Sequence, residues 1–441
     1  MNLKDQLIKS FENLTLTKNG SESEHVRSLR SEGMQIFSTQ GFPTMKDEEW
    51  KYTPLNKSIK HDYQLQSHAH IDLSSSDIDP LLCSGVDSYK LVFVNGVFSP
   101  SLSVTADEDS FTVSHLKDAF KGGSEIFNQH YGSIADKSQS MVSLNTACAQ
   151  EGAFVHVKAG AVVDKLIQII YINSTTDASL SQVRNLFVVE DRAEVQLFER
   201  HHSLNSEYVF TNTVSESFVG DSAYYKHFKI QNDQDTTTLV DSTFVKQGAK
   251  SSALVDTFAF GGDLTRNNLH FEFSGEYAEA HMDAITLLKS DSIVDHHTFV
   301  DHALPNCQSN QLYKGIYDEN SKGVFNGKVM VRQDAQKTNA FQQNNNLLLS
   351  DNAAIDTKPQ LEIFADDVAC SHGCTIGQLD EEALFYMQSR GIPEKEAKAF
   401  LMFAFAGDTL KNITIPELKE QLINLVARKL NVSLELNELD V

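Results

Sequence analysis

A chain of 441 residues is longer than the roughly 250 to 300 residues at which one compact core stops growing, so it requires two or three parts or a solenoid. Its net charge of -23 argues against binding to nucleic acid, which needs a concentrated basic face, and no apolar run approaches the roughly 18 residues of a membrane span. Five cysteines, an odd number, argue against a disulfide framework, and the first residues lack an export signal, so we expect a cytoplasmic protein.

The first 88 residues are predicted to form a helical N-terminal domain and a linker. A helix is expected because four apolar side chains fall on one helical face, namely Val26, Leu29, Ile36 and Phe37. Ser21 and Glu24 have the spacing of a capping box before this run, and Gly41 ends it. Residues 66–88, rich in Ser, Asp and His, are interpreted as the linker to the next domain.

Two short motifs precede the central region. The only tryptophan, Trp50, follows a cluster of acidic residues and is interpreted as part of an aromatic lid packed on a domain edge. Asn95 and Gly96 separate two apolar runs and predict a hairpin turn, because these residues favour the positive φ that both central positions require. Residues 115–150 are expected to be helical or irregular, and strands dominate after them.

Residues 89–378 are predicted to form the core. A small residue precedes an alternating strand at five positions that are 32, 30, 26 and 29 residues apart, namely Ala161, Ala193, Ala223, Ala249 and Ala278. The pattern resumes at Gly323 and again at Ala354. A near-constant step with alternating strands is typical of a solenoid, in which each turn buries one face against its neighbours. We therefore expect a mainly β fold with a parallel β-helix over residues 90–370, and a β-sandwich with Greek-key links is the alternative.

Residues 366–378 place two thiols and an imidazole within five positions, at Cys370, His372 and Cys374. Thiolate and imidazole are ligands for zinc, copper and iron–sulfur clusters, so an exposed segment of this kind can hold a metal. The ligand set is incomplete, because a structural zinc site needs four protein ligands and the other cysteines stand alone. Three interpretations remain open here: an incomplete metal site, a structural zinc-binding module, and two buried cysteines beside a turn histidine.

Residues 379–441 are predicted to form a C-terminal helical domain. Asp380 is expected to cap its first helix, and Pro393 opens the second. Residues 397–405 are almost wholly apolar, which is typical of a helix buried in its own domain or against another protein. A third helix starts at Pro416 and carries one apolar stripe, formed by Leu418, Leu422, Leu425, Val426 and Leu430.

Further histidines are interpreted as surface residues. Residues 295–302 contain three histidines, but strand alternation puts His296 and His302 on the face opposite His297. Only convergent ligands bind a metal well, so polar solenoid surface is favoured over a metal site. The histidine pair at residues 201–202 has no thiol nearby in sequence and is interpreted in the same way.

A rival function is that of a β-helix enzyme acting on polysaccharide. It would use paired carboxylates such as Asp291, Asp295 and Asp301 on one face of the solenoid. Such enzymes are commonly exported and line a groove with aromatic side chains, whereas this chain has no export signal and one tryptophan. The glycines at residues 261–262 lack the lysine of a phosphate-binding loop and are interpreted as a turn.

Four segments together resemble the SufB/SufD family of iron–sulfur cluster assembly proteins. They are Glu-Trp-Lys-Tyr-Thr-Pro at residues 49–54, the asparagine-rich segment 342–349, Cys-Ser-His-Gly at 370–373 and the helical segment 384–393. The match spans the whole chain, and the early tryptophan and the Cys-Ser-His-Gly form resemble SufD more than SufB. The resemblance implies a right-handed parallel β-helix between helical ends, in a scaffold subunit without turnover of its own.

The resemblance also implies partners. A SufB-like subunit is expected to pair through the last strands of the β-helix. A SufC-like ATPase is expected to dock on the terminal helices and to hydrolyse the ATP, with Phe400, Phe403 and Phe405 as docking residues. The chain alone is expected to form a homodimer, because open end strands are adhesive.

Site residues follow from the same resemblance. Cys370 and His372 are expected at the subunit seam, where they hold a nascent iron–sulfur cluster shared with the partner, and the isolated chain need not contain one. Whether Cys374 takes part is open, since a small residue is expected at that position. Asp366 and Asp367 are near enough in sequence to accept a hydrogen bond from the second nitrogen of His372.

Overall fold

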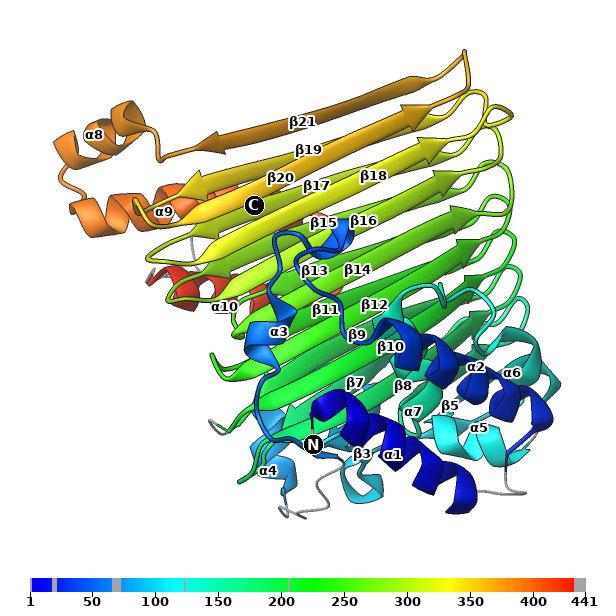
Figure 1. Ribbon diagram of the computed structural model, residues 1–441. Coiled ribbons are helices and arrows are strands. Elements are labelled where there is room, and N and C mark those ends of the chain that lie inside the picture. Colours follow the sequence, from blue (N-terminus) through cyan, green and yellow to red (C-terminus); the bar gives the residue numbers. More distant parts are fainter. Residues whose placement is uncertain (1, 18–21, 66–72, 123, 205–206, 432–441) are drawn as a thin grey trace.

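The computed structural model describes residues 2–17, 22–65, 73–122, 124–204 and 207–431. Its centre is a solenoid in which the chain passes alternately between two sheets of mainly parallel strands (Figure 1). The first sheet contains, in spatial order, β20 (Ala354–Ile363), β18 (Lys322–Val331), β16 (Ile293–His302), β14 (Leu264–Phe273), β12 (Thr237–Gln247), β10 (Val209–Val219), β8 (Ser179–Val189), β6 (Ala153–Val157), β5 (Phe111–His115) and β4 (Ala106–Asp107), and β1 (Gln64–Leu65) pairs with β8. The second sheet contains β21 (Ala369–Gly377), β19 (Asn339–Leu348), β17 (Gln308–Tyr317), β15 (Glu279–Leu288), β13 (Ser252–Ala259), β11 (Tyr224–Asn232), β9 (Glu194–Ser203), β7 (Leu166–Asn173), β2 (Ser88–Val94) and β3 (Val97–Phe98). The predicted parallel β-helix with helical N-terminal and C-terminal parts is confirmed.

Consecutive coils are nearly equal in length, because each strand pairs with the strand one coil later. Tyr224 pairs with Glu194, 30 residues before it, and with Ser252, 28 residues after it. The predicted repeat therefore reflects the coil. Ala249 is wrong, since the residue before Ser252 is Ser251 and Ala249 lies inside the preceding turn. Gly323 and Ala354 lie in β18 and β20 of the first sheet, whereas the other positions precede strands of the second sheet.

A left-handed turn residue before each of the strands β9, β11, β13, β15, β17 and β19 of the second sheet explains the repeat. Its φ lies between 56° and 64° in six coils of the described chain, at Arg192, Ser222, Lys250, Tyr277, Asn306 and Lys337. The residue after it is small or medium-sized and buried, at Ala193, Ala223, Ser251, Ala278, Cys307 and Thr338. The chain reverses there between the two sheets, so the first residue of the new direction points into a narrow corner.

Helices of the N-terminal part cover the outer face of the first sheet at its early end (Figure 1). They are α1 (Leu3–Thr17), α2 (Glu24–Gln40), α5 (Leu116–Gly122), α6 (Glu125–His130) and α7 (Ser140–Cys148). The predicted helix is confirmed as α2, which ends at Gly41 with a φ of 71°. Its first turn is capped by Ser23, whose hydroxyl accepts a hydrogen bond from Val26 N, while the expected cap Ser21 lies outside the described residues. Apolar side chains of α1 and α2 share one buried cluster with β10, β12 and β14.

The segment around Trp50 crosses the outer face of the first sheet. It contains η1 (Glu48–Trp50) and α3 (Leu55–Ser58). The Trp50 ring lies over Arg266 of β14, with 4.4 Å between the guanidinium carbon and the ring centroid, and Glu48 pairs with Lys358 of β20 at 2.8 Å. The expected aromatic packing is present, and it lies across the sheet rather than along a domain edge.

The expected linker at residues 66–88 is wrong for its described part. Residues 66–72 lie outside the described residues, and the rest forms α4 (Ser75–Ile78) and η2 (Asp79–Leu81). Leu82 and Cys83 are buried, and Gln421 Nε2 donates a hydrogen bond to the carbonyl of Leu82 at 2.9 Å. This segment is therefore part of the core beneath the C-terminal helices. Its few buried apolar residues are outnumbered by polar ones, so its composition is typical of a linker.

Helices also follow the solenoid, namely α8 (Glu381–Ser389), α9 (Glu394–Gly407), η4 (Asp408–Leu410) and α10 (Pro416–Leu430). The predicted apolar stripe of α10 is buried against the outer face of the second sheet. Asp380 caps α8, since its carboxylate accepts hydrogen bonds from Glu382 N at 2.9 Å and Ala383 N at 3.2 Å. In contrast to α10, α8 buries none of its residues and projects from the body (Figure 1). None of the helices in the described ranges has the length and apolar character needed to cross a bilayer.

Candidate metal-ligating site

The solenoid ends in two strands that each pair on one side only. β20 pairs with β18 and β21 with β19, and no further strand of the described chain covers them (Figure 1). Outward N–H and C=O groups of both strands are therefore available to another chain. Exposed apolar side chains lie at the same end, at Ile363, Phe364 and Ile376, which are 40%, 62% and 50% exposed.

Three candidate ligands lie on one face of β21. Cys370, His372 and Cys374 alternate along the strand, so their side chains point to the same side of the sheet. Cys370 packs against the apolar cluster between the sheets, and the Cys374 thiol lies 3.4 Å from the hydroxyl of Thr357 on β20. The ligand face therefore looks across the open end toward the first sheet, and two thiols and one imidazole share that space.

The three side chains differ in exposure. Cys370 is half-buried, whereas His372 and Cys374 are exposed. Burial raises the pKa of the Cys370 thiol, although a hydrogen bond from the Ala340 backbone opposes the shift. A metal bound there has to displace the proton, because the thiolate is the ligand form. The His372 ring forms no hydrogen bond or ion pair among the described residues, so both its nitrogens are available.

The acidic residues expected beside His372 lie in the turn before β21. Asp366 is exposed, and Asp367 pairs with Lys337. The backbone N–H of Asp367 also donates to Gln336 Oε1 at 2.9 Å. Within the described chain neither carboxylate contacts His372, so any such hydrogen bond needs a rearrangement of the turn.

The phenylalanines expected to dock an ATPase are only partly exposed. Phe400 is 37% exposed on α9, whereas Phe403 and Phe405 pack against the cluster beneath the C-terminal helices. The most exposed large apolar side chains of these helices are instead Phe385 and Tyr386 on α8, at 73% and 58%. Sequence reasoning missed them, although the apolar content of a helix with no buried residue is a signal of an interaction surface.

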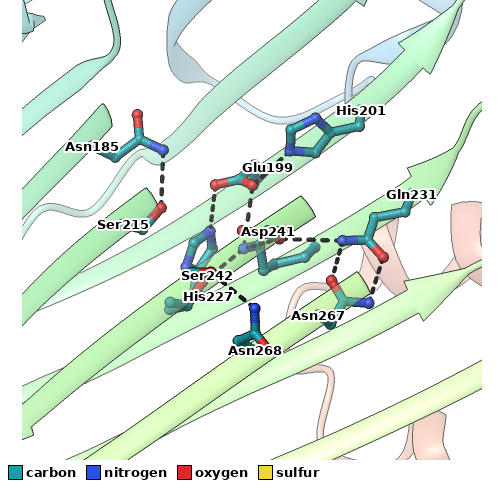
Figure 2. Close-up of polar contacts among 12 residues, drawn as sticks. Asn185, Glu199, His201, Ser215, His227, Gln231, Asp241, Ser242, Asn267 and Asn268 are labelled. Atoms are coloured by element: carbon teal, nitrogen blue, oxygen red, sulfur yellow. Dashed lines mark hydrogen bonds and ion pairs between the residues drawn. The ribbon is translucent and has the colours of Figure 1, made fainter. Parts of the chain in front are cut away.

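A second group of potential ligands is enclosed between the sheets (Figure 2). Potential ligand atoms of Glu199, His201 and Asp241 lie within 4.8 Å of one another, and all three residues are buried. Glu199 accepts hydrogen bonds from His201 Nε2 at 2.9 Å and His227 Nε2 at 3.2 Å. His201 was interpreted as a surface residue, which is wrong, because alternation along β9 turns it inward beside Glu199.

Lys229 already supplies the cation of this buried group. Its Nζ lies 2.5 Å from Asp241 and 3.4 Å from Glu199. Burial alone would lower the pKa of Lys229, but Asp241 and Glu199 raise it above its usual value. Burial likewise opposes ionisation of Glu199, yet Lys229 and the two histidines hold its pKa well below the usual range. The network is therefore an internal ion pair, and a divalent cation would have to displace the lysine.

Residues 295–302 lie in β16 and are mostly buried, so their interpretation as polar surface is wrong. Asp295 is buried on the outer side, where Arg266 Nη1 lies 2.6 Å from its carboxylate. His296 points between the sheets and shares a hydrogen bond with the Thr286 hydroxyl at 2.9 Å, and burial lowers its pKa to about 4. The predicted split between the two faces is confirmed, and it prevents these side chains from converging.

The carboxylates of the rival polysaccharide enzyme do not form an open pair. Asp291 lies in the turn before β16 and accepts a hydrogen bond from Asn320 Nδ2 at 3.1 Å. Asp301 lies near the other end of the strand, about 30 Å away at the usual rise per residue, and pairs with Arg332 at 2.6 Å. Asp295, between them, is enclosed in its ion pair. Retaining or inverting hydrolysis needs two carboxyl groups within about 10 Å, so this rival has no support at this face.

Fold and site together define a class of protein, a β-solenoid with helical ends that displays soft metal ligands at an open edge. Residues 171–405 match the family model described as "SUF system FeS cluster assembly, SufBD core domain". Residues 1–169 match the one described as "SufBD protein N-terminal region". The chain therefore belongs to the SufBD family of iron–sulfur cluster assembly proteins, as the sequence motifs predicted.

Individual relatives agree over nearly the whole chain. An iron–sulfur cluster assembly SufBD family protein of Synechocystis sp. is 31% identical over 418 residues, which is 92% of each chain. The iron–sulfur cluster assembly protein SufD of Escherichia coli is 30% identical over 400 residues, covering 90% of this chain and 91% of the relative. SufD of Bacillus subtilis is 22% identical over 440 residues, covering 97% and 98%.

Proposed function

We propose that this protein is a non-catalytic scaffold subunit that holds a nascent iron–sulfur cluster at a seam with a second subunit. The observation that carries the proposal is the shared face of Cys370, His372 and Cys374 at an end of the solenoid that no described strand covers. The cluster is cargo under assembly, so the chain alone need not contain one. Family membership makes iron–sulfur chemistry the relevant use of these soft ligands.

The incomplete ligand set supports assembly between two chains. A cluster of two or four irons is usually held by four protein ligands, and β21 offers at most two thiolates and one imidazole. A second chain at the open end can add the missing ligand and exclude water from ferrous iron and sulfide. Ligation by a histidine in place of a cysteine raises the reduction potential of a cluster, so a mixed site differs chemically from one with four cysteines.

A SufB-like subunit is the proposed partner at this seam. Two open strand edges and the apolar side chains of Ile363, Phe364 and Ile376 form a surface that favours strand-to-strand pairing. When that partner is absent, a second copy of the chain offers equivalent edges, which supports the expected homodimer. We place this assembly in the cytoplasm.

A SufC-like ATPase is proposed to dock on α8 and α9 and to hydrolyse the ATP. The exposed rings of Phe385, Tyr386 and Phe400 give these helices an apolar surface that the solenoid does not cover. Phe403 and Phe405 contribute from beneath, where they fix α9 against the cluster. Lys314 Nζ donates to the Phe405 carbonyl at 2.8 Å and pairs with Asp408 at 2.6 Å, so α9 is firmly attached.

Co-expression with SufB and SufC under anaerobic conditions tests the site. We expect His372→Ala to leave the three-chain complex intact but to abolish the visible absorption and the acid-labile sulfide of the cluster. The matched control is Ser371→Ala, whose exposed side chain occupies the opposite face of the same strand. Full cluster yield from His372→Ala would refute the site assignment.

Serine variants decide which thiol binds iron. We expect Cys370→Ser to lower the iron content of the complex, because the Cys370 side chain is half-buried on the ligand face. A similar loss for Cys374→Ser adds Cys374 to the ligand set, whereas an unchanged iron content removes it. Stoichiometric zinc in the isolated chain, lost with Cys374→Ser, would instead favour the structural zinc interpretation.

A further inference from the structure

Gln342 is a buried amide with no hydrogen-bond partner, and it lies directly beneath His372. The two residues are Cα partners on β19 and β21, so their side chains stack on the same inward face. Gln342 is 1% exposed, and neither its Oε1 nor its Nε2 has a partner among the described residues. A buried polar group left unpaired costs about 1–3 kcal/mol, so the presence of an unpaired glutamine at this position needs an explanation.

The facing sheet leaves room for this amide. A Cβ atom at Gly327 of β18 would lie 2.4 Å from Gln342 Nε2, so the glutamine amide reaches across the interior into the space that the missing side chain leaves, and a larger residue there would displace it. On β20, the Cα partner of Gly327 is Pro359, which carries no polar side-chain group. The first sheet therefore offers the amide space but no side-chain partner at the open end.

The coil below supplies one polar neighbour. Gln311 on β17 is the Cα partner of Gln342, and its Oε1 accepts a hydrogen bond from the Thr298 hydroxyl at 2.7 Å. Gln311 Nε2 is buried without a partner as well. Three consecutive coils thus stack Gln311, Gln342 and His372 on one face, with unused hydrogen-bonding atoms between them.

We propose that Gln342 is the positioning residue of His372. The inference rests on the proposed function of that histidine. When one ring nitrogen binds iron, the other donates its N–H to Gln342 Oε1. A ligating histidine needs such an acceptor to fix its tautomer and ring orientation, and loss of the acceptor typically weakens metal affinity about 10–100-fold. Asp366 and Asp367 are less suited, because they precede the strand and Asp367 pairs with Lys337.

The test uses the cluster-loaded complex with SufB and SufC. Gln342→Leu removes the acceptor, and Gln342→Glu keeps one. The matched control is Gln343→Leu, whose side chain is exposed on the opposite face. We expect Gln342→Leu to lose iron to a chelator about 10–100-fold more readily and to change the imidazole nitrogen coupling in the electron paramagnetic resonance spectrum of the reduced cluster. Gln342→Glu and the control should retain iron as the native complex does.

Several results would overturn the inference. Unchanged iron retention and nitrogen coupling in Gln342→Leu, in a preparation where His372→Ala abolishes the cluster, would refute the role of Gln342 and leave the proposed function standing. Iron loss in Asp366→Asn or Asp367→Asn, without loss in Gln342→Leu, would assign the acceptor to the turn. A native cluster in His372→Ala would refute both proposals.

A second variant covers the case in which Gln342→Leu fails to fold. Gly327→Ala retains Gln342 but adds a methyl group where the amide now lies, so the amide must move. We expect the same faster loss of iron from this variant. A native rate of iron loss from a folded Gly327→Ala complex, in which a changed amide environment is verified by nuclear magnetic resonance, would count against Gln342 as the acceptor.

Discussion

Replacing Lys229 by methionine removes the ammonium that pairs with Glu199 and Asp241 and keeps a chain of similar length. Lys229 is 2% exposed, and its ammonium contacts two carboxylates, those of Asp241 at 2.5 Å and Glu199 at 3.4 Å. It also donates a hydrogen bond to the Thr243 hydroxyl at 2.9 Å. The substitution leaves both carboxylates between the sheets, where water cannot reach them.

The magnitude follows from these distances. At an effective dielectric constant of about 20, the gross attraction is about 7 kcal/mol to Asp241 and about 5 kcal/mol to Glu199. Desolvation of the ammonium offsets most of this, and removing one partner of a buried ion pair typically costs about 3–5 kcal/mol. We expect a loss of that size, which is a large share of the roughly 5–15 kcal/mol that stabilises a typical domain.

Urea unfolding followed by circular dichroism measures the loss. The matched control is Lys246→Met, because Lys246 pairs with Glu272 at 2.9 Å but both side chains are over a third exposed. Such a surface pair contributes about 0–1 kcal/mol. The deficit of Lys229→Met should shrink as the pH falls, since unpaired buried carboxylates take up protons in the folded state. Equal small losses for the two variants would refute the view that Lys229 neutralises this network.

Three further predictions concern the C-terminal helices and the sheet beneath them. Burial and the neighbouring Asp283 raise the pKa of Asp256 well above its usual value, and burial raises that of Asp283 to about 6. The folded state thus binds more protons than the unfolded state, and stability falls as the pH rises through about 6. Asp256→Asn should therefore raise the thermal midpoint at about pH 8 and have little effect near pH 5, and an equal shift at both pH values would contradict the assignment. Replacing Phe385 and Tyr386 together by serine should weaken capture of the ATPase about tenfold or more without changing the unfolding midpoint. Phe341→Ser, on the solenoid and 44% exposed, is the control, and equal binding by both variants would count against docking on α8. Asp380→Ala should cost α8 about 1 kcal/mol, seen as faster amide exchange in its first turn, and Asp380→Ser should restore protection.

The coil could be predicted from the sequence because its turns impose a local rule. A residue with positive φ followed by a buried small residue, as at Arg192 and Ala193, returns once per coil and marks the repeat. The hairpin at Asn95 and Gly96, with φ of 52° and 75°, is equally local and is also confirmed. The error at Ala249 arose because two small residues lie in one turn, and only strand pairing shows which one begins the strand.

Buried polar residues could not be predicted, because their partners are distant in sequence. His201 follows Glu199 by only two residues, but the burial of this pair depends on Lys229, which arrives from the next coil and neutralises the carboxylate between the sheets. Asp295 is covered by a segment that comes from the N-terminal part, where the Thr53 hydroxyl donates to its carboxylate. Their polar character is therefore typical of surface residues, although each forms an ion pair inside the protein.

The sequence predicts the candidate ligands more readily than the residues that position them. The chemistry of Cys370 and His372 is visible in the sequence, and their shared face follows from strand alternation once β21 is placed. The role proposed for Gln342 required two facts that only the structure gives, the pairing of β19 with β21 and the close approach of the Gln342 amide to Gly327. Register, rather than residue type, therefore limits how far sequence reasoning can describe this site.

A physical reason for a ligand site at this position lies in the solenoid itself. Inside the coil, inward polar side chains have strands on both sides and can pair across the interior, as Gln231 of β11 and Asn267 of β14 do, with 2.7 Å from Gln231 Nε2 to Asn267 Oδ1. The last coil has a neighbouring coil on one side only, so polar side chains stacked there keep hydrogen-bonding atoms without partners. In the proposed function, a metal cluster and a second chain supply His372 with the neighbours that a further coil would have supplied. Ending a polar repeat thus leaves potential ligands unpaired without any change in the fold, provided that the last strand carries polar side chains instead of an apolar cap.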